Sequence, residues 1–151
     1  GLHRLRQLWE EVTSVTGQPF SHALPDGTVY NSELPCRALE ACRGITGVPP
    51  FEMNHELQRL FFVEGVNIND RTLLLDVASS HHLARDDFSK ALDSREIETR
   101  VQWGFQSSRR YGTSALPTVA VADGDGEYRL FAGGYVSGEQ LVSDLRSWLD
   151  D

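Results

Sequence analysis

The chain has 151 residues, 40% of them hydrophobic and 24% charged, which is enough for one hydrophobic core. Its formal net charge of -8 argues against nucleic acid or an anionic membrane as a partner, because phosphate groups are bound by a basic face. No apolar run approaches the roughly 20 residues of a membrane-spanning helix, so we expect no membrane partner.

The N-terminal segment is predicted to be an amphipathic helix. Apolar residues recur at helical spacing through residues 2–12, and charged residues fill the opposite face. Residues 16–32 contain two prolines and two glycines, which predicts an irregular connection. We expect Phe20, Val29 or Tyr30 to anchor this connection.

A run of helices follows. Asn69 is expected to cap one of them and Ser94 another, because both residue types accept hydrogen bonds from the first free backbone N–H groups. The pair Arg109 and Arg110 is expected on a solvated helix face. The predicted helices cover about 34–43, 50–64, 70–81, 85–92 and 94–111.

The C-terminal part is predicted to be a β-hairpin followed by a helix. Pro117 precedes an apolar strand over 118–122, a position that suits proline because it donates no ladder hydrogen bond. An Asp-Gly turn separates this strand from a second one over 128–132. Ser137 and Gln140 then have the spacing of a capping box at the start of the last helix.

Six short motifs occur in order along nearly the whole chain. They are residues 16–20 (TGQPF), 31–38 (NSELPCRA), 57–62 (LQRLFF), 66–68 (VNI), 116–118 (LPT) and 133–135 (GGY). In this order they resemble the DsbA family of thioredoxin-like proteins, in particular the cytoplasmic FrnE-type dithiol-disulfide isomerases of bacteria. The strand, hairpin turn, second strand and helix predicted for the C-terminal part correspond to half of a thioredoxin fold.

The resemblance implies an α/β, thioredoxin-like fold in a single, partial domain over 1–151. A large helical insertion would cover about 34–112, and the thioredoxin hairpin and helix about 116–150. Such proteins begin with a strand, a Cys-x-x-Cys helix start and a second strand, roughly 50 residues that we do not find here. We therefore expect a mostly helical chain with one C-terminal hairpin. Because the chain begins with Gly1, we expect it to be part of a longer protein.

The resemblance also implies a substrate site around the proline. In the family, the loop before a cis-proline faces the attacking cysteine, and its backbone pairs with the substrate chain. Carried over, Leu116, Pro117 and Thr118 would bind substrate, and the Leu116–Pro117 bond would be cis. The sequence contains no Cys-x-x-Cys, so it supplies no catalytic residue and we expect the chain by itself to be inactive.

Two cysteines, Cys36 and Cys42, are expected on one helix. Six helical residues separate their Cα atoms by about 9 Å along the axis, beyond the roughly 7 Å limit for a disulfide. We interpret them as small half-buried side chains, and so few cysteines fit a reducing cytoplasm.

No metal or cofactor site is predicted. His81 and His82 are adjacent and point about 100° apart on a helix, so they lack the spacing of a ligand pair. The acidic turn over 123–127 lacks the frame of a calcium loop.

Three functions remain open. The first is part of a DsbA-family thiol-disulfide oxidoreductase or isomerase, acting on a protein or small-molecule thiol or disulfide. The second is a relative of the glutathione-dependent 2-hydroxychromene-2-carboxylate isomerases and kappa-class glutathione transferases. The third is a redox-inactive module that binds a peptide or partner. Without a first strand, the strand over 118–122 would have an exposed edge, which predicts a homodimer.

Overall fold

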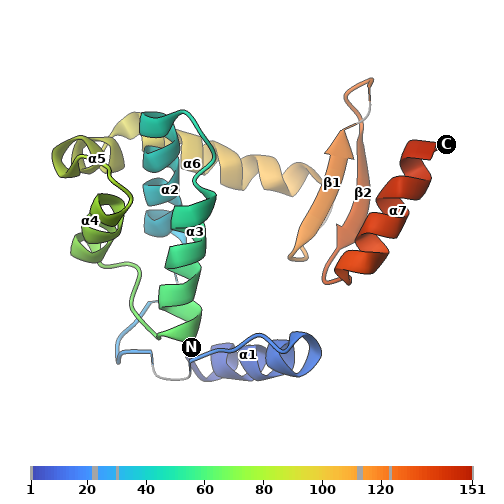
Figure 1. Ribbon diagram of the computed structural model, residues 1–151, viewed down its shortest axis with the longest axis horizontal. Coiled ribbons are helices and arrows are strands. Elements are labelled where there is room, and N and C mark those ends of the chain that lie inside the picture. The colour runs from blue at the N-terminus through green and yellow to red at the C-terminus, as the bar shows by residue number, and fades with distance from the viewer. Residues whose placement is uncertain (1, 22–23, 30, 112–113, 123, 151) are drawn as a thin grey trace. The chain divides into compact units, whose positions relative to one another are not determined.

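A computed structural model describes residues 2–21, 24–29, 31–111, 114–122 and 124–150. The chain divides into two compact units, Gly1–Val101 and Gln102–Asp151, and the division falls within helix α6 (Arg95–Ser108). As predicted, the described residues are mostly helical, with one antiparallel pair of strands near the C-terminus (Figure 1).

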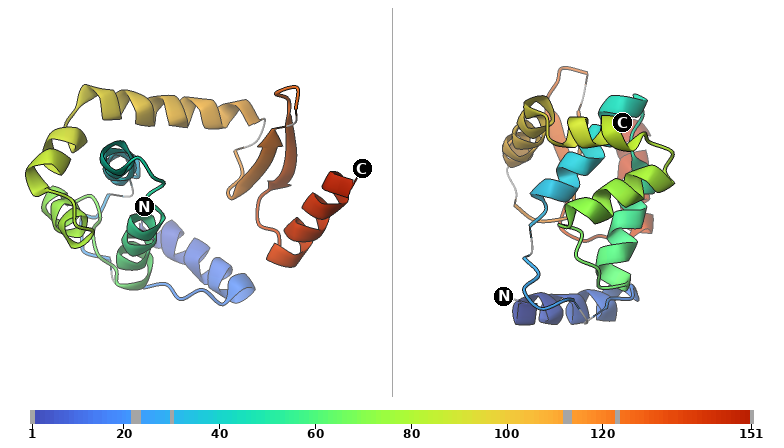
Figure 2. Two further views of the ribbon diagram at one scale, coloured as in Figure 1. Left: turned by 45° about the horizontal axis from the view of Figure 1, so that its top comes forward. Right: turned by 90° about the vertical axis from the view of Figure 1, so that its left-hand side faces the viewer.

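The first unit is a cluster of helices. Helices α2, α3, α4 and α5 pack against one another, and α1 crosses at the end of α3 (Figures 1 and 2). The main core includes Phe88, Met53, Leu74 and Leu92, which are almost completely buried. The elements of this unit before α6 are α1 (Leu2–Thr16), α2 (Glu33–Thr46), α3 (Phe51–Gln58), η1 (Arg59–Val63), α4 (Arg71–Ser80) and α5 (Arg85–Leu92).

A second, aromatic cluster holds α1 and the irregular connection to the rest of the unit. Phe20 stacks on Trp9 with ring centroids 5.5 Å apart, and Trp9 meets Phe61 edge-on at 5.7 Å. Phe20 is therefore the anchor expected of this connection, whereas Val29 is 68% exposed. Tyr30, the third candidate, lies outside the described residues.

Two helix starts test the predicted caps. Ser94 Oγ accepts a hydrogen bond from Ile97 N at 3.2 Å, so this prediction is confirmed. The prediction of Asn69 as a cap is wrong. Asp70 caps α4 instead, because its extended backbone lets Oδ1 accept from Thr72 N at 2.7 Å.

The helix predicted over 50–64 changes its hydrogen-bonding pattern halfway. Its first part is the α-helix α3, and its second part, η1, is a π-helix in which Glu64 N donates to Arg59 O at 3.1 Å. Such wide turns are rare, occur mostly as single turns within α-helices and are frequent at functional sites.

The second unit contains the end of α6, the short 3₁₀ helix η2 (Arg109–Tyr111), strands β1 (Thr118–Ala122) and β2 (Tyr128–Gly133), and α7 (Gly138–Asp150). Thr118 pairs with Gly133 and Ala122 with Tyr128, with a bulge between Val119 and Ala120. The turn that joins the strands includes Asp123, which lies outside the described residues. Helix α7 runs beside β2 (Figure 1), where Trp148 meets Phe131 with ring centroids 5.6 Å apart.

The predicted capping box at α7 is only half formed. Ser137 Oγ accepts from Gln140 N at 3.2 Å, but the Gln140 amide donates to Asp144 Oδ1 at 2.8 Å instead of reaching back to the cap. The helix therefore begins where it was predicted to begin, with one side-chain cap rather than two.

Candidate functional site

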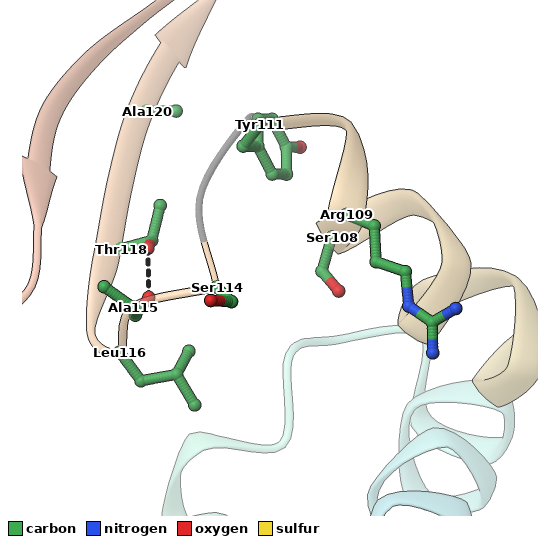
Figure 3. Close-up of a pocket in the computed structure, with 8 residues that line it drawn as sticks. All are labelled: Ser108, Arg109, Tyr111, Ser114, Ala115, Leu116, Thr118 and Ala120. Atoms are coloured by element: carbon green, nitrogen blue, oxygen red, sulfur yellow. Dashed lines mark hydrogen bonds between the residues drawn. The ribbon is translucent and has the colours of Figure 1, made fainter.

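An opening in the second unit surrounds the segment that precedes β1. Its volume is about 720 Å³ (Figure 3). The end of α6 and η2 form one wall, and the segment over 114–118 forms the other. The lining residues are Ser108, Arg109, Tyr111, Ser114, Ala115, Leu116, Thr118 and Ala120.

The backbone around Pro117 is held by two hydrogen bonds and by the strand pairing. The Leu116–Pro117 peptide bond is cis. Thr118 Oγ1 donates to Ala115 O at 2.6 Å, which closes the loop on one side (Figure 3). Pro117 O accepts from Gly134 N at 2.9 Å, which ties the loop to the end of β2. The segment therefore enters β1 with its conformation set on both sides of the proline.

Leu116 is presented outward by this loop. Its side chain is 87% exposed, and its backbone N–H and C=O form no hydrogen bond with any described residue. Its neighbours Ala115 and Pro117, in contrast, both have a carbonyl that accepts a hydrogen bond. An exposed backbone donor and acceptor beside a held strand end suit pairing with an extended chain.

Among the described residues that line the opening, Arg109 is the charged one. The Arg109 guanidinium makes no ion pair with a described residue, and it extends on the side away from Leu116 (Figure 3). Tyr111 is held by an edge-on contact with Tyr128, with ring centroids 5.0 Å apart. The opening therefore offers one cation, several hydroxyl groups and exposed backbone.

Only part of this lining could be predicted from the sequence. Of the three predicted residues, Leu116 and Thr118 line the opening, and Pro117 lies between them in the same loop. Ser108, Arg109, Tyr111 and Ser114 were missed. Their nearness in sequence to Pro117 was the available signal, since a short connection must bring the end of α6 close to the start of β1.

Both thiols lie in the other unit. Cys36 is half-buried and Cys42 is buried, both on α2, and both are free. Burial raises the pKa of the Cys36 thiol, and the carboxylate of Glu40 raises it further. Burial also raises the pKa of the Cys42 thiol, against the lowering effect of a hydrogen bond with Thr46. Disulfide exchange requires a thiolate, and these environments disfavour it.

Neither a metal centre nor a membrane-spanning helix is found among the described residues. No three His, Cys, Asp or Glu side chains of the described ranges come together as metal ligands. His81 is held by Glu56 instead, with Nε2 and Oε2 2.6 Å apart. None of the described helices combines the length and hydrophobicity that crossing a bilayer requires.

Comparison with known proteins yields neighbours of one kind of fold. A candidate protein disulfide isomerase from Nitrosomonas europaea has a TM-score of 0.88 and 29% identity, covering 98% of this chain and 73% of that one. The cytosolic disulfide reductase DsbM from Pseudomonas aeruginosa has a TM-score of 0.75 and 24% identity, covering 99% of this chain and 75% of DsbM. A structure of DsbM with GSH has a TM-score of 0.67 and 23% identity, covering 93% of this chain and 71% of that one.

Among curated proteins, the ClpXP adapter protein SpxH of Bacillus subtilis is 25% identical over 123 residues. The match covers 78% of this chain and 40% of SpxH, so the chain spans less than half of that relative. No protein-family model matches the chain.

Proposed function

We propose that this chain, which has a DsbA-like thioredoxin fold, is the substrate-positioning part of a thiol-disulfide oxidoreductase or isomerase. The observation that carries the proposal is the backbone of Leu116, whose N–H and C=O form no hydrogen bond with a described residue and lie beside the cis peptide bond to Pro117. The disulfide isomerase and reductase among the structural neighbours support the same reaction class.

In this reaction, a thiolate attacks one sulfur of a substrate disulfide and the other sulfur leaves as a thiolate. A second thiolate then attacks the enzyme sulfur of the mixed disulfide, the bound substrate sulfur leaves as a thiolate, and the two enzyme thiols end as a disulfide. The two exchanging thiols are not supplied by Cys36 or Cys42, whose pKa values are raised by burial. The role of this chain is to hold the substrate backbone, through Leu116, Pro117 and Thr118, at the strand end where exchange takes place.

Replacing Leu116 tests the binding role, because one substitution can remove the backbone N–H while another removes only the exposed side chain. Leu116→Pro removes the N–H donor, and Leu116→Ala keeps it. With glutathione disulfide as the probe in an NMR titration, we expect Leu116→Pro to weaken binding by about five- to tenfold, the effect of one hydrogen bond. Leu116→Ala should remain within about threefold of the wild type. Equal losses in both variants, or no binding at the Thr118 amide in the wild type, would contradict the proposal.

The catalytic half of the proposal predicts no turnover by this chain alone. We expect the rate at which dithiothreitol reduces insulin to be unchanged when the chain is added. Acceleration that disappears in a variant carrying Cys36→Ser and Cys42→Ser would show that the thiols on α2 take part.

Two alternatives each have a feature in their favour. A redox-inactive binding module is favoured by the lack of a thiol in the opening and by the adapter role in the printed name of SpxH. Such a module should bind an extended peptide equally well with or without a disulfide. A glutathione-dependent enzyme is favoured by Arg109, a cation that forms no ion pair with a described residue and suits a carboxylate. Arg109→Gln should then weaken glutathione binding, with Arg110→Gln as the control.

Location and association are part of the same proposal. Few and unpaired cysteines suit the cytoplasm. The β1 edge not facing β2 has no strand beside it among the described residues, which suits a homodimer. The division into a helical insertion over about 34–112 and a thioredoxin part over about 116–150 also remains a proposal.

A further inference from the structure

A second cavity lies within the first unit, separate from the opening around Leu116. Its volume is about 170 Å³, and residues of α2, α3 and η1 form most of its walls. Leu39, Leu57 and Ile68 supply aliphatic walls, and Phe61 and Phe62 supply aromatic ones. None of the described lining residues carries a charge. This cavity is therefore an apolar space of limited size.

The π-helix η1 shapes the aromatic wall. In an α-helix, consecutive side chains point about 100° apart and seldom share one contact surface. Here the rings of Phe61 and Phe62 lie 5.0 Å apart, and both pack edge-on against Trp9, at 5.7 and 5.8 Å. Both also line the cavity. Trp9 thus supports the two rings that border the cavity, and the wide turn places them side by side.

The polar part of the lining consists largely of carboxamides without full hydrogen bonding. Asn54 is half-buried and Gln58 is exposed, so both amides lie at the solvent-facing rim of the cavity, one turn apart on α3, and neither makes a hydrogen bond with a described residue. Asn31 accepts from Glu33 N at 2.9 Å through Oδ1, which leaves its NH₂ group available. Donors and acceptors are thus present at the rim of the apolar cavity, but none of its described lining residues offers a counter-ion for a charged ligand.

We propose that this cavity binds a neutral molecule with a single aromatic ring and one hydroxyl or carbonyl group, of the phenol class. An apolar cavity of about 150 Å³ accommodates benzene, so the volume of about 170 Å³ found here fits one ring with a small substituent. The ring packs against Phe61 and Phe62, and the polar group meets the amides of Asn54 and Gln58. A charged group is rejected, because it would lose its hydration without gaining a counter-charge.

The test is an NMR titration of the whole chain with three probes of similar size: p-cresol, toluene and benzoate. We expect p-cresol to shift the amides of α3 and η1 with a dissociation constant on the order of 1 mM, as expected for a ligand of this size. Toluene, which lacks the hydroxyl group, should bind roughly three- to tenfold more weakly. Benzoate should cause no shift at the cavity.

The variant Asn54→Leu separates the two parts of the site. It should reduce p-cresol binding to the level of toluene and leave toluene binding unchanged. Gln7→Leu, which replaces an exposed carboxamide on α1 outside the lining, is the control. Equal binding of p-cresol and benzoate, or shifts confined to residues outside the cavity, would overturn the proposal.

Cys36 provides a readout that does not depend on any variant, because its side chain also lines the cavity. Saturating p-cresol should slow the alkylation of Cys36 by N-ethylmaleimide at least threefold. Cys42 is buried outside the lining and serves as an internal control. Trypsin cleaves after Arg37, so mass spectrometry measures the two thiols on different peptides. An unchanged Cys36 rate at saturating p-cresol would also contradict the proposal.

Discussion

The start of α4 offers a sharp test, since structure and sequence pattern assign its cap to different residues. Asp70 Oδ1 accepts from Thr72 N at 2.7 Å and from Leu73 N at 3.4 Å, so only the first is a full-strength hydrogen bond. Asp70→Ala removes one cap, worth about 1 kcal/mol, and a negative charge at a helix N-terminus, worth about 0.3–1 kcal/mol. We expect the free energy of unfolding to fall by about 1–2 kcal/mol.

Two control variants separate the cap from its surroundings. Asp70→Asn keeps a side-chain acceptor and should cost about 0.3–1 kcal/mol, the charge contribution alone. Asn69 Nδ2 donates to Val29 O at 3.2 Å, and this hydrogen bond is exposed to solvent. Asn69→Ala should therefore cost about 0.5 kcal/mol or less.

Urea denaturation followed by far-UV circular dichroism measures these differences, provided that the m-value is unchanged. Because the chain has two compact units, native-state hydrogen exchange of the α4 amides should accompany it, to assign the loss to the first unit. A larger loss for Asn69→Ala than for Asp70→Ala would refute the assignment of the cap.

Three further predictions concern the thiol, the core and the sheet edge. Glu40→Gln should lower the pKa of the Cys36 thiol, because the substitution removes a repelling carboxylate. Alkylation of Cys36 should then be faster than in the wild type at pH values below the pKa of this thiol. Well above this pKa the two rates should be equal, because the thiol is ionised in both proteins. Phe88→Ala truncates a fully buried side chain and should lower the free energy of unfolding, measured by urea denaturation, by about 3–5 kcal/mol. Phe51 is 76% exposed, so Phe51→Ala should lower it by about 0.5 kcal/mol or less. Similar losses in the two variants would show that the core is misassigned. Sedimentation velocity should show dimers at micromolar concentration if the free edge of Thr118–Ala122 pairs with a second copy; a monomer of 16.9 kDa at every concentration would contradict this.

The order and type of the elements could be predicted from the sequence because their signals are local. Apolar residues at helical spacing predicted α1, and a proline before an apolar run with an Asp-Gly turn behind it predicted the hairpin. Ser94 and Ser137 were recognised as caps because a cap acts within three residues of itself. Six residues of separation on one helix likewise predicted that Cys36 and Cys42 would remain free.

Finer local choices were decided by geometry that the sequence pattern does not resolve. Asn69 and Asp70 are both good capping residues, and only the extended backbone of Asp70 selects it. The sequence of the π-helix η1 has the apolar spacing of an ordinary helix. Its wide turn accompanies the packing of the Phe61 and Phe62 rings on Trp9, which only the structure shows.

The sequence by itself therefore determined the class of fold and the segment around Pro117, since turn chemistry, capping and periodicity act over a few residues. Tertiary structure alone decided which side chains share a cavity. Ser108 and Tyr111 line one opening together with Leu116, and Cys36 lines a cavity together with Leu57 and Phe61 because α2 packs beside α3. Such neighbours are brought together by burial of apolar surface, which is non-directional and leaves no fixed spacing in the sequence.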